Sequence, residues 1–91
     1  MEQEIKDLIQ THYKSARVYS VAIEKSAIFK RDCIVVIKCT AGRSQNYPNI
    51  ALRILNKFPN ISIVHFTGGW IEGVYTRKTL EWAGYKVKQH K

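Results

Sequence analysis

The chain has 91 residues, of which 45% are hydrophobic and 11% aromatic, and its formal net charge at pH 7 is +8. This length suits a single domain over residues 1–91, and the hydrophobic share excludes an intrinsically disordered chain. The excess of Lys and Arg favours an anionic partner, such as nucleic acid, an anionic membrane surface, an acidic protein or a phosphorylated small molecule.

The positive charge is concentrated in the middle of the chain. Residues 14–57 carry nine basic and two acidic side chains, whereas residues 1–13 carry three acidic side chains and one basic. Net charge is informative about partners and not about fold. We therefore expect the central segment to form the cationic surface and the first helix to lie away from it.

The first half of the chain reads as one helix followed by two strands. Residues 2–14 have hydrophobic side chains at spacings of three and four, which predicts an amphipathic helix. Residues 18–29 alternate as a half-buried strand does, and residues 33–40 are β-prone and apolar on both faces. The polar break at 30–32 predicts that these two strands form a hairpin.

A loop over residues 41–47 leads into a second helix. This helix is predicted to begin at Pro48, because the missing N–H of proline costs nothing at the first helical position. Pro59 ends it, because the residue before a proline avoids helical backbone angles. Residues 61–67 then read as a third strand.

The last part of the chain predicts a second hairpin and a short helix. The glycine pair at 68–69 reads as a two-residue turn into a fourth strand at 70–75, since such turns need positive φ. Thr76 is the predicted N-cap of a helix at 77–83. Residues 85–88 are expected to form either a last edge strand or a tail.

The predicted order is α-β-β-α-β-β-α, with an optional final strand. We therefore expect an α+β fold with a mainly antiparallel sheet of four to five strands and helices packed on one face. Such a sheet leaves its edges open, which allows a homodimer through one edge. No apolar run approaches the ~20 residues of a membrane span, and the N-terminus is acidic, so we expect a cytoplasmic protein without membrane contact.

The loop after the second strand is the first candidate site. Gly42 permits close approach of a ligand, Arg43 offers a two-pronged guanidinium, and Ser44 offers a hydroxyl. The helix that follows adds positive potential at its N-terminus, which suits an anion. The alternative is an ordinary polar loop in which Asn46 caps the helix.

The same segment resembles the cradle of rhodaneses and cysteine phosphatases, through IVVIKCTAGRS, HFTGGW and WAGYKV over residues 34–87. The resemblance implies that Cys39 is a persulfide-bearing nucleophile whose pKa the loop lowers. This chain departs from the phosphatase pattern, with three residues rather than five between Cys39 and Arg43. The alternative makes Cys33 and Cys39 small core residues of a protein in a reducing compartment.

The second candidate is the basic set with aromatic side chains interleaved. Nucleic-acid grooves use this combination, because cations neutralise phosphates and flat rings stack on unpaired bases. We assign phosphate contacts to Lys and Arg and stacking to Tyr47, with Trp70 as a second exposed ring. The assigned contacts are Lys30, Arg31, Arg43, Tyr47 and Arg53, with Arg77 and Lys78 as a second cluster.

Three functions remain open from the sequence. The leading hypothesis is a non-enzymatic binding module that engages nucleic acid through a cationic surface. The second is a small regulator or inhibitor, of the kind phages encode, that binds an acidic surface of a host protein. The third is an anion- or sulfur-handling site at residues 39–46. No Ser/His/Asp set, carboxylate pair or metal-ligand spacing is recognisable, so we expect neither a metal nor a cofactor.

Overall fold

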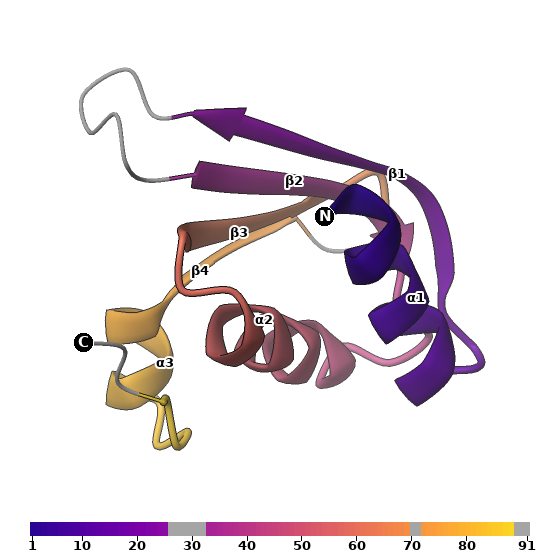
Figure 1. Ribbon diagram of the computed structural model, residues 1–91. Helices are drawn as coiled ribbons and strands as arrows, with labels where there is room; N and C mark the ends of the chain where they lie inside the picture. Colours follow the sequence, from indigo (N-terminus) through magenta and orange to yellow (C-terminus); the bar gives the residue numbers. More distant parts are fainter. Residues whose placement is uncertain (26–32, 70–71, 89–91) are drawn as a thin grey trace.

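A computed structural model describes residues 1–25, 33–69 and 72–88 of the chain. Within these residues the chain forms three helices and one four-stranded sheet, which confirms the α+β class (Figure 1). The elements in chain order are α1 (Glu2–His12), β1 (Arg17–Lys25), β2 (Cys33–Thr40), α2 (Asn46–Lys57), β3 (Ile61–Thr67), β4 (Gly73–Thr76) and α3 (Arg77–Trp82).

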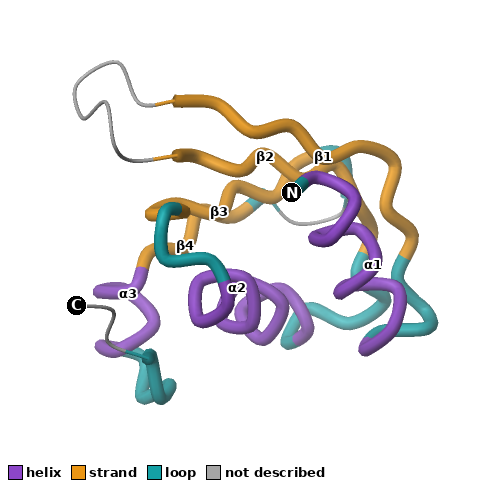
Figure 2. The backbone as a smooth tube through the Cα atoms, in the orientation of Figure 1, coloured by secondary structure: helices purple, strands orange, loops and turns teal. Residues whose placement is uncertain are grey.

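The sheet has the strand order β1-β2-β3-β4 and is mixed (Figure 2). β1 pairs with β2 and β3 with β4 in antiparallel fashion, but the two central strands, β2 and β3, run parallel. The expectation of a mainly antiparallel sheet is therefore wrong at its centre. The parallel pairing arises because α2 connects β2 to β3. A helical connection returns the chain to the end of the sheet at which β2 began, so the next strand runs in the same direction.

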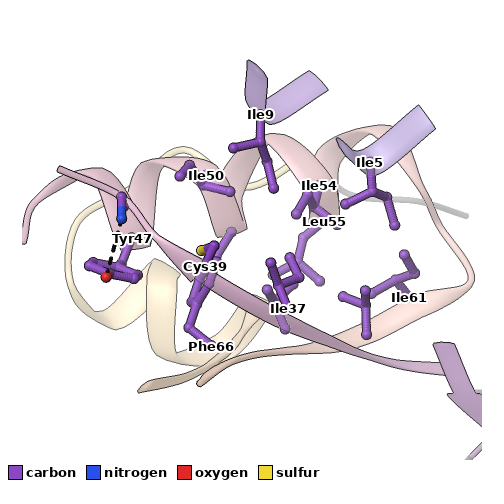
Figure 3. Close-up of a cluster of buried hydrophobic side chains, with 14 of the residues drawn as sticks. Ile5, Ile9, Ile37, Cys39, Tyr47, Ile50, Ile54, Leu55, Ile61 and Phe66 are labelled. Atoms are coloured by element: carbon purple, nitrogen blue, oxygen red, sulfur yellow. Dashed lines mark hydrogen bonds between the residues drawn. The ribbon is translucent and has the colours of Figure 1, made fainter. Parts of the chain in front are cut away.

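The core lies between one face of the sheet and the helices. Alternate residues of β2, which are Val35, Ile37 and Cys39, are fully buried, and Val64 and Phe66 of β3 lie on the same face. Each buried aliphatic or aromatic side chain contributes about 1.5–3 kcal/mol of burial free energy. The helices complete the cluster drawn in Figure 3 with Ile5, Ile9, Ile50, Ile54 and Leu55.

In the part of the chain that the structure describes, the opposite face of the sheet carries no core residue. Its central row is Ala22, Val36, His65 and Val74, which stand opposite one another in neighbouring strands. None of these four side chains is buried, whereas all three described helices add residues to the core on the other face. The helices therefore pack on one side of the sheet.

The connection from β3 to β4 differs from the predicted two-residue turn. Gly68 has a φ of +76°, but a Cβ on Gly69 would overlap the carbonyl oxygen of Cys39. Gly69 thus allows the chain to pass close to β2, and β4 begins only at Gly73. Of the predicted strand at 70–75, positions 70–71 lie outside the described residues, and the observed strand runs from Gly73 to Thr76.

The cap of α3 is confirmed, but the residues described after this helix, up to position 88, form no strand. The hydroxyl of Thr76 accepts a hydrogen bond from the N–H of Thr79 at 3.1 Å, and the hydroxyl of Thr79 accepts one from the N–H of Thr76 at 2.9 Å. Residues 85–88 form a loop, in which the N–H of Lys88 donates to the side-chain oxygen of Asn56 at 2.7 Å. This segment is therefore hydrogen-bonded to α2 and does not extend the sheet.

Two predicted boundaries shift or lie outside the described residues. α2 begins at Asn46, so Pro48 lies inside its first turn, where no N–H is needed. The predicted end of the first strand at 26–29 and the turn at 30–32 fall outside the described residues. None of the helices in the described ranges is long and apolar enough to cross a membrane.

Candidate functional site

A pocket of about 510 Å³ lies where the start of β1 meets the loop between β2 and α2. Its wall includes three of the predicted site residues, Gly42, Arg43 and Ser44, all of which are exposed. Two residues that the sequence did not assign, Arg17 and Tyr19, join them from β1. The full lining is Arg17, Tyr19, Thr40, Ala41, Gly42, Arg43, Ser44 and Tyr47.

The pocket lies at the carboxyl end of β2, where the parallel strand β3 also ends. Ligands of sheets with parallel strands bind beyond this end, because loops and helix N-termini gather there. Gly42 has a φ of +82°, and a Cβ on it would lie 2.8 Å from Oγ of Ser15. Glycine is therefore required for this loop to lie against the turn that follows α1.

Tyr19 lies in the pocket because β1 is irregular at this point. Val18 pairs with Cys39 and Ser20 pairs with Lys38, which leaves Tyr19 as the extra residue of a β-bulge. A bulge leaves its extra residue unpaired and redirects the side chain. The side chain of Tyr19 is 58% exposed, so its ring is accessible to a ligand.

The pocket is positively charged. Arg17 and Arg43 are both exposed, and neither forms an ion pair with another residue in the part of the chain that the structure describes. Among the residues that the structure describes, no Asp or Glu lines the pocket. Two guanidinium groups without a carboxylate give a local positive potential that attracts an anionic ligand.

Tyr47 has a structural role and not the predicted stacking role. Its side chain is only 4% exposed, and its ring packs edge-on against Phe66 with 5.1 Å between ring centroids. Its hydroxyl accepts a hydrogen bond from the N–H of Ala41 at 3.3 Å (Figure 3). A ring that is buried in the core has no free face on which a base could stack. Tyr47 instead stabilises the loop through its hydrogen bond with Ala41.

The N-terminus of α2 is largely engaged by the chain itself. The N–H of Asn46 donates to the carbonyl of Arg43 at 3.0 Å, and the N–H of Tyr47 donates to the carbonyl of Ser44 at 3.3 Å. The side chain of Asn46 donates to the carbonyl of Ala41 at 2.7 Å, so the expectation that Asn46 caps the helix is wrong. The exposed arginines, rather than the helix end, are therefore the groups available to an anion.

The predicted second cluster lies elsewhere. α3, which begins with Arg77 and Lys78, is at the opposite end of the molecule from the connections that form the pocket (Figure 1). Nη2 of Arg77 donates to the carbonyls of Leu55 at 2.8 Å and Phe58 at 3.1 Å. These carbonyls belong to the end of α2, where helical partners are missing. Arg77 therefore stabilises the fold, and it does not belong to the proposed contact surface.

Arg53 lies in a separate groove of about 650 Å³ between α1 and α2. Its Nε donates to the hydroxyl of Tyr13 at 3.4 Å, and its guanidinium carbon is 6.0 Å from the centre of that ring. Glu4 and Asp7 line the same groove. Two carboxylates lower the positive potential there, so Arg53 is not part of the anion-binding pocket.

The cations of the central segment do not all converge on one surface. Lys30 and Arg31, which were predicted to join the contact, lie outside the described residues, and so does Trp70. Lys38 is an exposed cation in the same part of the sheet, where it pairs with Ser20 directly after the bulge, but it does not line the pocket. The described cations therefore form a smaller site around the pocket than the sequence predicts.

Cys39 lacks the properties of a nucleophile. It is fully buried, and burial raises the pKa of its thiol from 9.0 to about 11. The rhodanese-like alternative requires an accessible thiolate with a lowered pKa. The expectation of a reactive thiol at this position is therefore wrong, because the side chain is buried.

At pH 8 we expect the thiol of Cys39 to stay unreactive toward Ellman's reagent while the chain is folded. Half-buried Cys33 reacts first, and Cys39 reacts only after unfolding in guanidinium chloride. The raised pKa also affects the free energy of unfolding. Because the thiol loses its proton more readily in the unfolded chain, the free energy of unfolding is expected to fall as pH rises from 9.0 to about 11. Labelling of Cys39 as fast as Cys33 in the folded protein would contradict this prediction.

Within the described ranges, no three His, Cys, Asp or Glu side chains are grouped so that they could hold a metal ion. The pocket itself combines an exposed aromatic ring with two exposed guanidinium groups. Comparisons with known protein families, with curated proteins and with solved structures find no match to this chain.

Proposed function

We propose that this domain binds single-stranded nucleic acid at the pocket between β1 and the loop that precedes α2. Arg17 and Arg43 contact neighbouring phosphates, and the ring of Tyr19 stacks on an unpaired base. The observation that carries the proposal is the meeting of one exposed ring with two guanidinium groups, which have neither an ion-pair partner nor a neighbouring carboxylate among the described residues.

The physical basis is the pairing of charge with stacking. Each phosphate that an arginine neutralises releases counterions, and the gain of entropy supports binding at low salt. Stacking of a base on an aromatic ring contributes about 1–3 kcal/mol and works for any base. The hydroxyl of Ser44 and the exposed backbone of Gly42 add hydrogen-bonding groups beside the two arginines. A duplex keeps its bases stacked inside, so the ring of Tyr19 favours a single strand.

The first test is the affinity for a short fluorescein-labelled oligothymidylate, measured by fluorescence anisotropy at low salt. The same duplexed sequence serves for comparison, and we expect the single strand to bind more tightly. Replacing Tyr19 by alanine is expected to weaken binding about tenfold, because the stacking contact is lost. Replacing Tyr19 by phenylalanine keeps the ring and is expected to preserve the affinity.

Trp82 provides the matched control, because it is 77% exposed and belongs to α3 at the far end of the molecule. Its replacement by alanine removes an exposed ring without touching the pocket and should leave the affinity unchanged. No binding of the single strand at low salt would exclude the proposal. An equal loss in the Trp82 and Tyr19 variants would exclude the pocket as the site.

An acidic protein surface is the competing partner. It would use the same two arginines, but it would not need a base-stacking ring. Retained oligonucleotide affinity in the Tyr19→Ala variant, together with loss in arginine variants, would therefore favour purely electrostatic binding. Such a result would point to a general polyanion partner and away from an unpaired base.

A further inference from the structure

β1 is an open edge of the sheet. In the described residues it pairs with β2 alone, and it is nine residues long, whereas the other edge strand, β4, has four. An edge strand presents unpaired backbone N–H and C=O groups on its outer side. The length of β1 makes it the edge at which a further strand would gain the most hydrogen bonds.

The central part of β1 lacks the usual protection of an edge. Proteins protect edges with proline, bulges or charged side chains. The bulge of β1 is near its start at Tyr19, and the residues from Ser20 to Ile23 contain neither proline nor charge. Val21 and Ile23 face the core side but are only half-buried. A neighbouring strand would cover their remaining apolar surface.

We propose that β1 pairs with β1 of a second copy of this chain, antiparallel, about a twofold axis at Ala22. The two sheets then join into one, and like faces meet because the axis is perpendicular to the sheet. Val21 stands opposite Ile23 of the second copy on the core side. Ser20 stands opposite Glu24 of the second copy on the other side, so no two like charges face each other.

The neighbouring registers are less favourable. An axis at Val21 would place Arg17 opposite Lys25 of the second copy, and like charges directly opposite one another destabilise a strand pair. An axis at Ile23 would place Glu24 opposite the apolar Ala22. The register centred on Ala22 is thus the one in which apolar residues face apolar residues and the charged ends face polar groups.

This pairing also bears on the pocket. In the same register Lys25 of the second copy stands opposite Tyr19, so each copy adds a cation beside the pocket of the other. This consequence rests on the proposed function, but the pairing of the strands does not. Because each copy carries a net charge of +8, screening by salt is expected to strengthen the dimer, whereas salt weakens binding of nucleic acid.

A register-specific disulfide tests the proposal without any nucleic acid. In a Cys33→Ser background, Ala22→Cys places two thiols directly across the axis, with Cα atoms about 4.5–5.5 Å apart, within disulfide reach. The matched variant Ser20→Cys places its two thiols about 13 Å apart along the strands, beyond disulfide reach. Mild oxidation is expected to link the first variant into a covalent dimer and leave the second unlinked.

Equal linking of both variants, or linking of neither, would overturn the proposal. A charge substitution supplies a second measurement that does not depend on oxidation. Replacing Ala22 by lysine places two ammonium groups opposite one another and is expected to raise the dimer dissociation constant about tenfold or more. Replacing the exposed Ala83 at the end of α3 by lysine adds the same charge and should have no effect. Masses from light scattering that are monomeric for the unaltered chain at high concentration would also overturn it.

Discussion

Replacing Arg17 and Arg43 together by alanine is expected to lower the affinity for a single-stranded oligonucleotide about 25-fold at 0.1 M salt. The reason is counterion release, which for single strands amounts to about 0.7 ions for each phosphate contact and gives roughly fivefold in affinity per contact at that salt. Both side chains are exposed, so their loss is expected to leave the fold intact. Fluorescence anisotropy with a labelled oligothymidylate measures the change.

The matched control removes the same charge from another place. Lys86 and Lys88 are exposed and lie in the segment after α3, at the opposite end of the molecule from the pocket (Figure 1). The double alanine variant of these two lysines is expected to lose much less affinity. If both double variants lose affinity equally, the binding follows net charge alone and the pocket has no special role.

Arg77→Ala is expected to destabilise the fold by about 2–3 kcal/mol, with little direct effect on nucleic-acid binding. Arg77 donates two hydrogen bonds to the last carbonyls of α2, at Leu55 and Phe58, and its removal leaves both part-buried oxygens without this donor. Small domains have a total stability of about 5–15 kcal/mol, so the change lowers Tm by roughly 10 °C or more. Urea unfolding followed by circular dichroism provides the measurement.

The neighbouring residue supplies the control for this second prediction. Lys78 is exposed and carries the same charge, so Lys78→Ala is expected to change stability by less than about 0.5 kcal/mol. Arg77→Lys keeps the charge but removes the guanidinium whose Nη2 donates to both carbonyls, so the stability of this variant should fall between that of the unaltered chain and that of Arg77→Ala. An Arg77→Ala chain of unchanged stability that no longer binds the oligonucleotide would restore Arg77 to the contact surface.

Elements with a clear local signal could be predicted from the sequence. The spacing of apolar residues located α1 and α2, Pro59 located the end of α2, and Thr76 located the start of α3. The parallel pairing of β2 and β3 has no signal within either strand. It follows from the helix between them, and a strand–helix–strand order already favours a parallel pair.

The site could be predicted only where its chemistry is local. Gly42, Arg43 and Ser44 are adjacent in the chain, so the sequence alone indicates that a loop between a strand and a helix carries an anion-binding set of residues. Tyr19 could not be found this way, because in the alternating pattern of its strand it resembles any half-buried position. The bulge that exposes it becomes visible only in the pairing with β2. Arg17 reaches the pocket through the same pairing.

For two side chains, residue type favours a role in binding, but each of them forms contacts with other segments of the chain instead. Tyr47 receives a hydrogen bond from Ala41 and packs on Phe66, and neither contact can be read from residue type. Arg77 is bound to carbonyls some twenty positions earlier in the chain. Long polar side chains with several donors are equally suited to a ligand and to an orphaned helix end, so only tertiary contacts decide between them.

The salt dependence of oligonucleotide affinity tests most directly whether Arg17 and Arg43 contact phosphates. We predict that the logarithm of the binding constant falls linearly with the logarithm of the salt concentration for the unaltered chain. In the variant lacking both arginines the slope should be shallower by about 1.4, and in the variant lacking Lys86 and Lys88 it should be unchanged. An identical slope with and without the two arginines would contradict the account.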